Sequence, residues 1–196
     1  MCNLHGLLII VINERGDSMK RIFLFVIGLL MLANICFADY QYKTFWGANN
    51  LVHMEAPTHW VQRYPGTIGN RVFLIDLHSP DDKAGVYVSY SKDKLAYNDF
   101  SEMREDVLEL LVVNDLEEMK NKYPSMVINY VNTNYNYLNR KSVLYLIDST
   151  FPQGRYRYMT IKFLKGGTVY SVVVMAHSYL INDFDWGRMV NSVVLK

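Results

Sequence analysis

Two adjacent glycines near the end of the chain, Gly166 and Gly167, separate two long stretches of strand-like sequence. Residues 155–164 and 168–177 are rich in β-branched and aromatic side chains, which pack well on a pleated surface. Glycine has no Cβ and therefore adopts the positive φ angles that a two-residue hairpin turn requires. The spacing predicts an antiparallel hairpin, and no other local feature constrains the fold as strongly.

Side chains along the first arm of this hairpin alternate between two faces, as the pleat of a strand requires. One face is mainly apolar and consists of Arg157, Met159, Ile161 and Phe163. The other face is mixed and consists of Tyr156, Tyr158, Thr160 and Lys162. We expect the apolar face to belong to the core, with the charged end of Arg157 reaching out to solvent.

Similar strand patterns occur on both sides of one long helical segment. They cover residues 40–46, 51–55, 71–77 and 85–90 before it, and 126–132 and 142–149 after it. Strands that come in runs, without a helix between each pair, favour hairpin connections. The sequence therefore predicts an α+β fold, in which an antiparallel sheet is flanked by one long helix and a C-terminal helix.

The long helix is predicted over residues 100–121. Asp99 with Glu102 matches a capping box, and apolar side chains follow at helical spacing. These side chains are Phe100, Met103, Val107, Leu110, Leu111 and Met119. The C-terminal helix is predicted to begin at Asn182 as its cap, with two aspartates in its first turn and an apolar face formed by Trp186, Met189, Val190 and Val193.

The N-terminal region has the features of a secretory signal peptide. Met19-Lys20-Arg21 is a basic start, residues 22–33 are an apolar block, and Cys36-Phe37-Ala38 places small residues before a cleavage site. An apolar helix of that length spans only about 18 Å, short of the roughly 30 Å hydrocarbon core. We therefore expect 19–38 to be a signal peptide cleaved after Ala38, with no membrane anchor left afterwards and a periplasmic or secreted product. Residues 1–18 are predicted to be a misassigned segment upstream of a true start at Met19, and residues 39–196 a single domain.

Removal of residues 1–38 changes the charge and the available chemistry. It takes away three basic and two acidic side chains from totals of 20 and 19, so that the formal net charge becomes zero. A balanced charge without basic runs argues against nucleic acid as a partner. Both cysteines, Cys2 and Cys36, are lost as well. The expected domain therefore has no disulfide, no thiol nucleophile and no cysteine-based metal site.

The chain resembles the PsbP-like superfamily. The similarity rests on the segment from Met54-Glu55-Ala56-Pro57 to Trp60, on the order of strands and helices, and on the closing Met189-Val190-Asn191-Ser192-Val193. That group takes in the extrinsic oxygen-evolving subunit of photosystem II, a Ran-binding nuclear import factor and small exported bacterial proteins. The resemblance implies an α/β/α sandwich whose members mostly act by binding other proteins, and it implies no catalytic residues.

Three histidines near carboxylates raise the question of a metal or catalytic site. His53, Glu55 and His59 form a weak polar cluster, in which His53 and Glu55 would share one side of a strand. Their spacing differs from that of the helical zinc motif, and a rim of hydrogen-bonding side chains is the alternative. His78 with Asp81 and Asp82 has the pattern of an ordinary turn. We therefore predict no catalytic residue, no metal and no cofactor.

Tyrosine is the most conspicuous residue of the mature region, which contains all 15 in the chain. Asparagine and threonine separate several of them, a composition favoured at recognition surfaces. The predicted surface consists of Tyr130, Tyr135, Tyr137, Tyr156, Tyr158 and Tyr179. The alternative is that these tyrosines cover the sheet beneath a helix, with only their hydroxyls in water.

The sequence favours an exported, non-enzymatic binding or accessory protein with a protein partner in the cell envelope. One alternative is a small-ligand or glycan binder that uses Trp46, Trp60 or Trp186 as a stacking platform. A second alternative is a small hydrolase that uses His53, His59 or His78.

Overall fold

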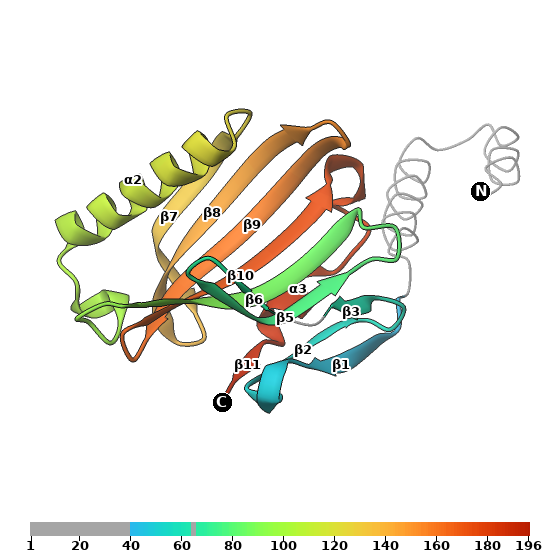
Figure 1. Ribbon diagram of the computed structural model, residues 1–196, viewed down its shortest axis with the longest axis horizontal. Coiled ribbons are helices and arrows are strands. Elements are labelled where there is room, and N and C mark those ends of the chain that lie inside the picture. The colour runs from blue at the N-terminus through green and yellow to red at the C-terminus, as the bar shows by residue number, and fades with distance from the viewer. Residues whose placement is uncertain (1–39, 64–65) are drawn as a thin grey trace, which may run out of the picture. The chain divides into compact units, whose positions relative to one another are not determined.

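The predicted hairpin lies at the centre of an eight-stranded antiparallel sheet. The computed structural model describes residues 40–63 and 66–196. The strand order is β3-β5-β6-β10-β9-β8-β7, with β4 paired to β5 at one end (Figure 1). The strands are β3 (Val61–Arg63), β4 (Thr67–Ile68), β5 (Arg71–His78), β6 (Ala84–Lys94), β7 (Val127–Tyr137), β8 (Arg140–Phe151), β9 (Gly154–Lys165) and β10 (Thr168–His177).

The turn between β9 and β10 confirms the hairpin prediction. Gly166 and Gly167 have φ angles of 56° and 75°, and Lys165 pairs directly with Thr168. The two β-branched and aromatic arms then remain in register for their whole length. Each predicted strand is present, but β3, β4 and β11 were not predicted, because two or three residues are too few to show an alternating pattern.

A second, three-stranded sheet packs on one face of the main sheet. It has the order β1-β2-β11, with β1 (Tyr42–Trp46), β2 (Val52–Pro57) and β11 (Val194–Leu195), and η1 (Ala48–Asn50) joins β1 to β2. Its buried residues Val52, Met54 and Ala56 join one cluster with Ile161 and Phe163 of β9. The predicted apolar face of β9 therefore lies in the core.

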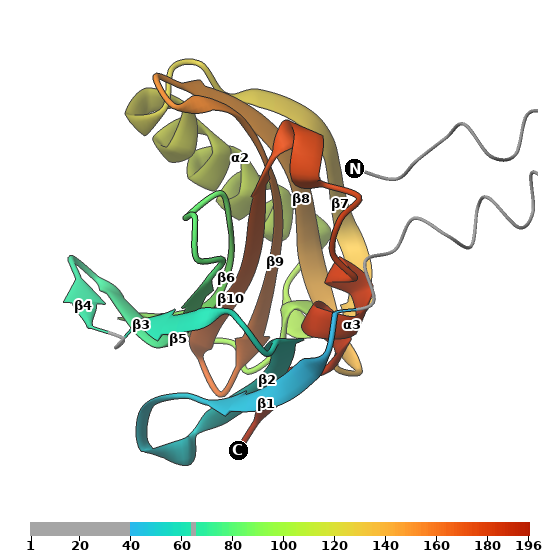
Figure 2. The same cartoon turned by 90° about the vertical axis from the view of Figure 1, so that its right-hand side faces the viewer.

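Helix α2 (Glu105–Lys122) lies on the opposite face of the main sheet, over β7, β8 and β9 (Figures 1 and 2). Leu108 and Val112 on the helix pack with Val143, Tyr145 and Ile147 of β8. The sheet bends strongly, so that β4, β5 and β6 turn toward the same side as the helix (Figure 2). The main sheet is thus covered on both faces, and its two hydrophobic clusters lie on opposite sides of it.

The predicted start of the long helix is wrong by five residues. Asp99 accepts a hydrogen bond from the Ser101 amide at 2.9 Å, and Glu102 accepts one from the Asn98 amide at 2.8 Å. These caps stabilise only a short 3-10 turn, η2 (Phe100–Glu102), because Met103 is extended with ψ of 142°. The apolar stripe was also misplaced, since Leu110 is 60% exposed.

The C-terminal helix, α3 (Trp186–Asn191), is shorter than predicted and has a different cap. Asp185, not Asn182, accepts the hydrogen bond from the Arg188 amide, at 2.8 Å. The turn η3 (Ser178–Leu180) joins β10 to the segment that leads into the helix. After α3 the chain adds β11 to the small sheet by pairing Val194 with His53.

These elements confirm an antiparallel α+β fold. The predicted upstream segment 1–18, signal peptide 19–38 and cleavage point after Ala38 lie outside the described residues. Among the helices that the structure describes, none has both the length and the apolar character needed to cross a bilayer.

Candidate binding groove

The weak polar cluster predicted from the sequence is not assembled into one site. His53 and Glu55 share a side of β2 as expected, but the ring of His53 packs on Trp46 at 4.5 Å between centroids. Glu55 accepts a hydrogen bond from Arg188 Nε at 2.7 Å, and the ring of His59 lies 5.1 Å from that of Tyr40. Within residues 40–63 and 66–196, no three His, Cys, Asp or Glu side chains are grouped so that they could hold a metal ion.

The three tryptophans do not form a common platform. Trp46 is 48% exposed, whereas Trp60 is 3% exposed and belongs to the core. Trp186 is partly buried and donates its indole N–H to the carbonyl of Ile181 at 2.7 Å. Two of the three indoles are therefore structural, and of the three predicted stacking residues only Trp46 presents a largely exposed ring.

The six predicted recognition tyrosines are distributed over both faces of the main sheet. Tyr137 is 3% exposed and donates a hydrogen bond to the carbonyl of Val190 at 2.7 Å, so its assignment to a recognition surface is wrong. Tyr130 and Tyr179 are 49% and 59% exposed. Tyr156 and Tyr158 are partly buried on the face that α2 covers. The residues therefore do not form one patch, and part of the set lies beneath other elements.

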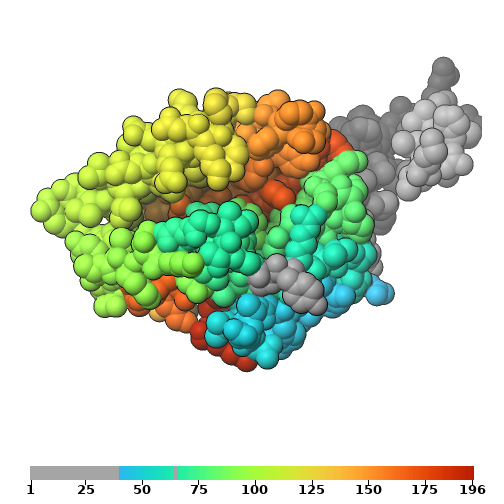
Figure 3. Space-filling view, in the orientation of Figure 1, coloured from blue at the N-terminus to red at the C-terminus, as the bar shows by residue number. Residues whose placement is uncertain are grey.

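A groove runs along the concave face of the main sheet, between α2 and the β5–β6 flank. Figure 3 shows it as a hollow whose floor is formed by β9 and β10. We define the concave groove by side chains from four elements: Arg71 of β5, Tyr87 of β6, Asp115 of α2, Tyr123 at the end of α2, and Tyr158 and Lys162 of β9. Alternation along β6 and β9 directs these strand residues to the same face as the helix.

The floor of the concave groove is unusually polar for a sheet interior. Ser89, Ser171 and Lys162 follow one another across β6, β10 and β9, in register. Both serines are nearly inaccessible to solvent, and the Lys162 side chain is only 12% exposed. The Ser89 hydroxyl has no hydrogen-bond partner within the described chain. Buried hydroxyls without partners cost free energy, so this floor is not explained by packing alone.

Lys162 forms an ion pair with Asp115 at the base of the helix wall. Burial lowers the pKa of the Lys162 ammonium, and the neighbouring Asp115 carboxylate opposes that effect. One carboxylate oxygen of Asp115, Oδ2, is buried and lacks a partner among the residues described. The pair therefore retains unused hydrogen-bonding capacity inside the groove.

Three phenols line the rest of the concave groove. Burial raises the pKa of Tyr87, and Tyr123 adds to the rise. Burial likewise raises the pKa of Tyr158, with further contributions from Tyr87 and Tyr123. The Arg71 guanidinium lies close enough to the Tyr87 hydroxyl to oppose the first of these shifts. In the described part of the chain, no carboxylate oxygen lies within 4.0 Å of that guanidinium.

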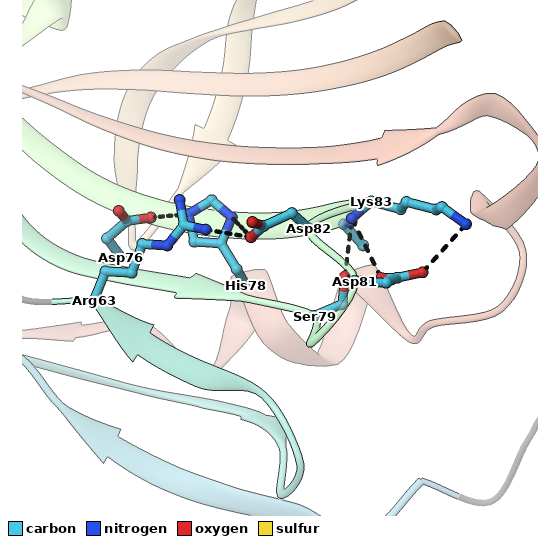
Figure 4. Close-up of polar contacts among 8 residues, drawn as sticks. Arg63, Asp76, His78, Ser79, Asp81, Asp82 and Lys83 are labelled. Carbon is cyan, nitrogen blue, oxygen red and sulfur yellow. Dashed lines mark hydrogen bonds and ion pairs between the residues drawn. The ribbon is translucent and has the colours of Figure 1, made fainter. Parts of the chain in front are cut away.

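A buried histidine lies at the β5–β6 turn, on the same face of the sheet (Figure 4). His78 Nε2 is 2.6 Å from Asp76 Oδ1, and Nδ1 is 3.7 Å from Asp82 Oδ1. Asp82 also pairs with Arg63 of β3. The two carboxylates flank opposite ring nitrogens, so they cannot converge on one metal ion. The imidazole packs over Gly85, where an added Cβ would lie 3.0 Å from Nδ1.

The turn that follows is held by a separate set of contacts. Ser79 Oγ donates to Asp81 Oδ1 at 2.7 Å and accepts from the Ala84 amide at 3.0 Å. Hydrogen bonding from Ser79 lowers the pKa of Asp81. This confirms the expectation that the aspartates after His78 belong to a turn, although Asp82 in addition faces the histidine.

Sequence reasoning missed the central residues of the groove. Asp115 occupies a position on the helix stripe that also contains Leu108, Val112 and Met119, where an apolar side chain is expected. Lys162 lies on the strand face that α2 covers, in line with Tyr158. The available signal was one charged residue on each of two faces that become buried, Asp115 on the helix and Lys162 on the strand. A buried charge requires a partner.

The comparisons with known proteins show the fold. No protein-family model matches the sequence, and no curated protein matches it. The solution structure of cyanobacterial PsbP (CyanoP) from Synechocystis sp. PCC 6803 is similar with a TM-score of 0.50 and 8% sequence identity. The similarity covers 80% of this chain and 94% of that one. The chain therefore has a PsbP-like fold, as the resemblance predicted.

Two further solved structures are similar. The Ran-binding protein Mog1p of Saccharomyces cerevisiae has a TM-score of 0.48 and 8% identity, over 80% of this chain and 96% of that one. A protein from Bacteroides thetaiotaomicron VPI-5482 has a TM-score of 0.44 and 9% identity, over 80% of this chain. The match spans about half of that protein's length, 49%.

Proposed function

We propose that this chain is an exported, non-enzymatic protein that binds a segment of another cell-envelope protein in the concave groove. The observation that carries the proposal is the composition of that groove: three tyrosines lie close together with a guanidinium that has no carboxylate partner among the described residues, on the same sheet face as the Lys162–Asp115 pair. Tyrosine and arginine supply most of the binding energy at protein interfaces, above all where the surrounding contacts exclude water.

The groove also fits a polypeptide better than an apolar ligand. Its partly exposed tyrosines, Tyr87 and Tyr158, carry hydroxyls that can hydrogen-bond a peptide backbone while their rings pack on its side chains. Its rim is aromatic, and Tyr123 at the end of α2 is 39% exposed. A ligand without donors and acceptors would leave these hydroxyls unpaired.

The arrangement around His78 supports a binding role over the hydrolase alternative. A catalytic base needs a ring nitrogen within hydrogen-bond reach of a nucleophile or substrate. In His78, Nε2 is paired with the Asp76 carboxylate and Nδ1 packs over Gly85. The His78 side chain is only 9% exposed. His53 and His59 contact aromatic rings at 4.5 and 5.1 Å. Export itself is supported by the basic start and apolar block of residues 19–38.

Site-specific photocrosslinking in the native host tests the proposal. The full chain is produced with a photoreactive phenylalanine analogue in place of Tyr123, at the rim of the groove, or in place of Thr44, an exposed position on β1. We expect a discrete adduct with one envelope protein from position 123 and none from position 44. The substitution Arg71→Gln should reduce the adduct several-fold, since it removes a guanidinium that no carboxylate neutralises within the described residues. Mass spectrometry of the adduct identifies the partner segment and should show that this chain begins at Asp39.

Two outcomes contradict the proposal. Equal adducts from positions 44 and 123 would show that the groove has no particular role. A position-123 adduct that Arg71→Gln leaves unchanged would show that the partner contacts only the outer end of α2.

A further inference from the structure

The outer strands of the main sheet carry a second polar cluster, on the face opposite α2. Residues of β8 alternate, so that Val143, Tyr145 and Ile147 pack under the helix. Leu146 and Asp148 therefore face the other way. Asp148 is paired across the sheet with Arg157 of β9, and Leu146 is paired with Tyr130 of β7. An open hollow on this face is lined by Asn129, Tyr130, Leu146 and Arg157.

Asp148 holds two arginines in fixed positions. Its Oδ1 accepts from Arg157 Nε at 2.8 Å, and its Oδ2 accepts from Nη2 of Arg157 at 3.2 Å and of Arg155 at 2.6 Å. The carboxylate side chain is 4% exposed, whereas those of Arg155 and Arg157 are 59% and 45% exposed. Hydrogen bonding from Arg157 lowers the pKa of Asp148, so the carboxylate stays charged. The cluster therefore keeps one uncompensated positive charge.

The free groups of the two arginines at the hollow are all donors. In the described chain, the Arg157 Nη1 group has no acceptor, and neither do Nε and Nη1 of Arg155. Asn129 and Tyr130 add an amide and a hydroxyl to the lining, and Leu146 adds an apolar surface. Both oxygens of the only carboxylate in the cluster, Asp148, are already occupied. The excess of donors and of positive charge favours a group that accepts hydrogen bonds and carries negative charge.

We propose that this hollow is a binding site for a small oxyanion, a carboxylate or a phosphate, carried on an apolar or aromatic body. The guanidinium of Arg157 donates to the anion from the edge that Asp148 leaves free, and Arg155 contributes the balancing charge. Arginine suits this role because its planar donors match the oxygens of both groups. Leu146 and the ring of Tyr130 contact the body of the ligand. The site lies on the opposite face from the concave groove, and it does not depend on the function proposed there.

Binding of simple probes to the purified full chain tests the site. Phenyl phosphate and benzoate carry the two candidate anions on the same ring, and benzamide is their neutral counterpart. We expect one or both anions to bind with a dissociation constant of about 1 mM, as suits a fragment-sized ligand. NMR titration of the labelled protein should show shifts centred on Asn129 and Tyr130, weakened by added salt. The anion with the lower dissociation constant shows whether the natural ligand carries a phosphate or a carboxylate.

Substitution of the arginines separates binding from structure. Arg157→Gln should weaken anion binding about tenfold, which corresponds to the loss of one charge-assisted hydrogen bond. Arg155→Gln should weaken it less, and it replaces the first variant if Arg157→Gln does not fold. The matched control is Arg104→Gln, because Arg104 is 80% exposed and pairs with Asp106 next to α2. The proposal is overturned if neither anion shifts these resonances at about 10 mM, ten times the expected constant. It is also overturned if benzamide binds equally well, or if both arginine variants bind like the native chain.

Discussion

Tyr137 carries its hydroxyl into the core, where it donates to the Val190 carbonyl at 2.7 Å. Val190 lies in α3, so this one hydrogen bond connects the edge strand β7 of the main sheet to the C-terminal helix. The ring packs against Phe163 with centroids 5.5 Å apart. The Val190 carbonyl also accepts a longer hydrogen bond from the Val193 amide, at 3.3 Å, so breaking the Tyr137 contact removes its shorter partner. A buried hydrogen bond of this kind contributes about 1 kcal/mol.

The substitution Tyr137→Phe should therefore lower the free energy of unfolding by about 1 to 2 kcal/mol. Urea denaturation, followed by tryptophan fluorescence, measures the change. Tyr130→Phe is the matched control, because Tyr130 lies on the same strand but is 49% exposed. We expect less than about 0.5 kcal/mol for that surface change. Equal losses from the two variants would show that the hydrogen bond to Val190 contributes nothing.

The sequence could not distinguish these two tyrosines. Both lie in the same tyrosine- and asparagine-rich stretch, and the pairing of β7 with β8 shifts register twice, between Ile128 and Tyr130 and between Asn132 and Tyr135. Each bulge changes which side chains face inward, so the regular alternation of a strand does not predict which residues of β7 are buried. Tyr137 is buried because α3, 53 residues away in the sequence, supplies its acceptor. Local pattern does not contain that information.

At the scale of elements, the β9–β10 turn shows where local sequence determines structure. Both glycines have positive φ, but their surroundings differ. A Cβ at Gly166 would meet nothing within 4 Å, whereas one at Gly167 would lie 2.9 Å from the carbonyl oxygen of Leu95. That carbonyl belongs to a segment held against the turn, since the Leu95 amide donates to the Gly167 oxygen at 2.8 Å.

Alanine substitutions should separate these two effects. Gly166→Ala should cost about 1 kcal/mol, the price of a positive φ for a residue with a Cβ. Gly167→Ala should cost about 2 to 4 kcal/mol, because backbone displacement adds to the same strain. Gly66→Ala, where the φ is ordinary and no atom lies within 4 Å, is the control and should change stability little. Thermal and urea unfolding measure all three, and the order would be contradicted if Gly166→Ala cost more than Gly167→Ala.

The helices show the limit of local signals. Asp99 and Glu102 are caps, as their spacing predicts, yet they cap a 3-10 turn that ends at an extended Met103. Phe100 and Met103 are both buried in the hydrophobic cluster that contains Leu108 and Val112 of α2, as their apolar character predicts. Their spacing continues smoothly into that of α2, so the periodicity of apolar residues does not reveal the break at the extended Met103.

At the scale of the whole molecule, the succession of strands and helices along the chain and the α+β class could be predicted, but the concave groove could not. Its defining residues come from β5, β6, α2 and β9, and sheet curvature brings them together (Figure 2). Twist and coiling of a sheet arise from all of its strands at once. The burial of Lys162 opposite Asp115 likewise depends on where the helix lies over the sheet.

Buried tyrosines on both faces of the main sheet determine how the molecule responds to alkaline pH. Burial raises the pKa of Tyr137, of Tyr145 and of Tyr158 above the ordinary value of 10.0. Above about pH 10 the unfolded chain releases these protons while the folded chain keeps them, so stability falls as the pH rises. Lys162 acts in the opposite sense, because burial lowers its pKa and the folded chain then binds fewer protons than the unfolded one. Burial raises the pKa of Tyr87 too, so tyrosines outnumber the one lysine and the net effect is a loss of stability.

We therefore expect the free energy of unfolding to decrease steeply above about pH 10, by up to about 1.4 kcal/mol per pH unit for each tyrosine that remains protonated only in the folded state. Urea denaturation at several pH values between 8 and 11 measures the slope, and absorbance of the phenolate reports ionisation on unfolding. Tyr145→Phe should reduce the slope by up to about 1.4 kcal/mol per pH unit, because it removes one proton that only the folded chain keeps. This change is expected whatever the substitution does to stability at neutral pH. The control Val127→Ala, at an exposed position of β7, removes no ionisable group and should leave the slope unchanged. If the slope is unchanged in Tyr145→Phe, or if stability rises above pH 10, the buried phenols do not control the alkaline limit of this fold.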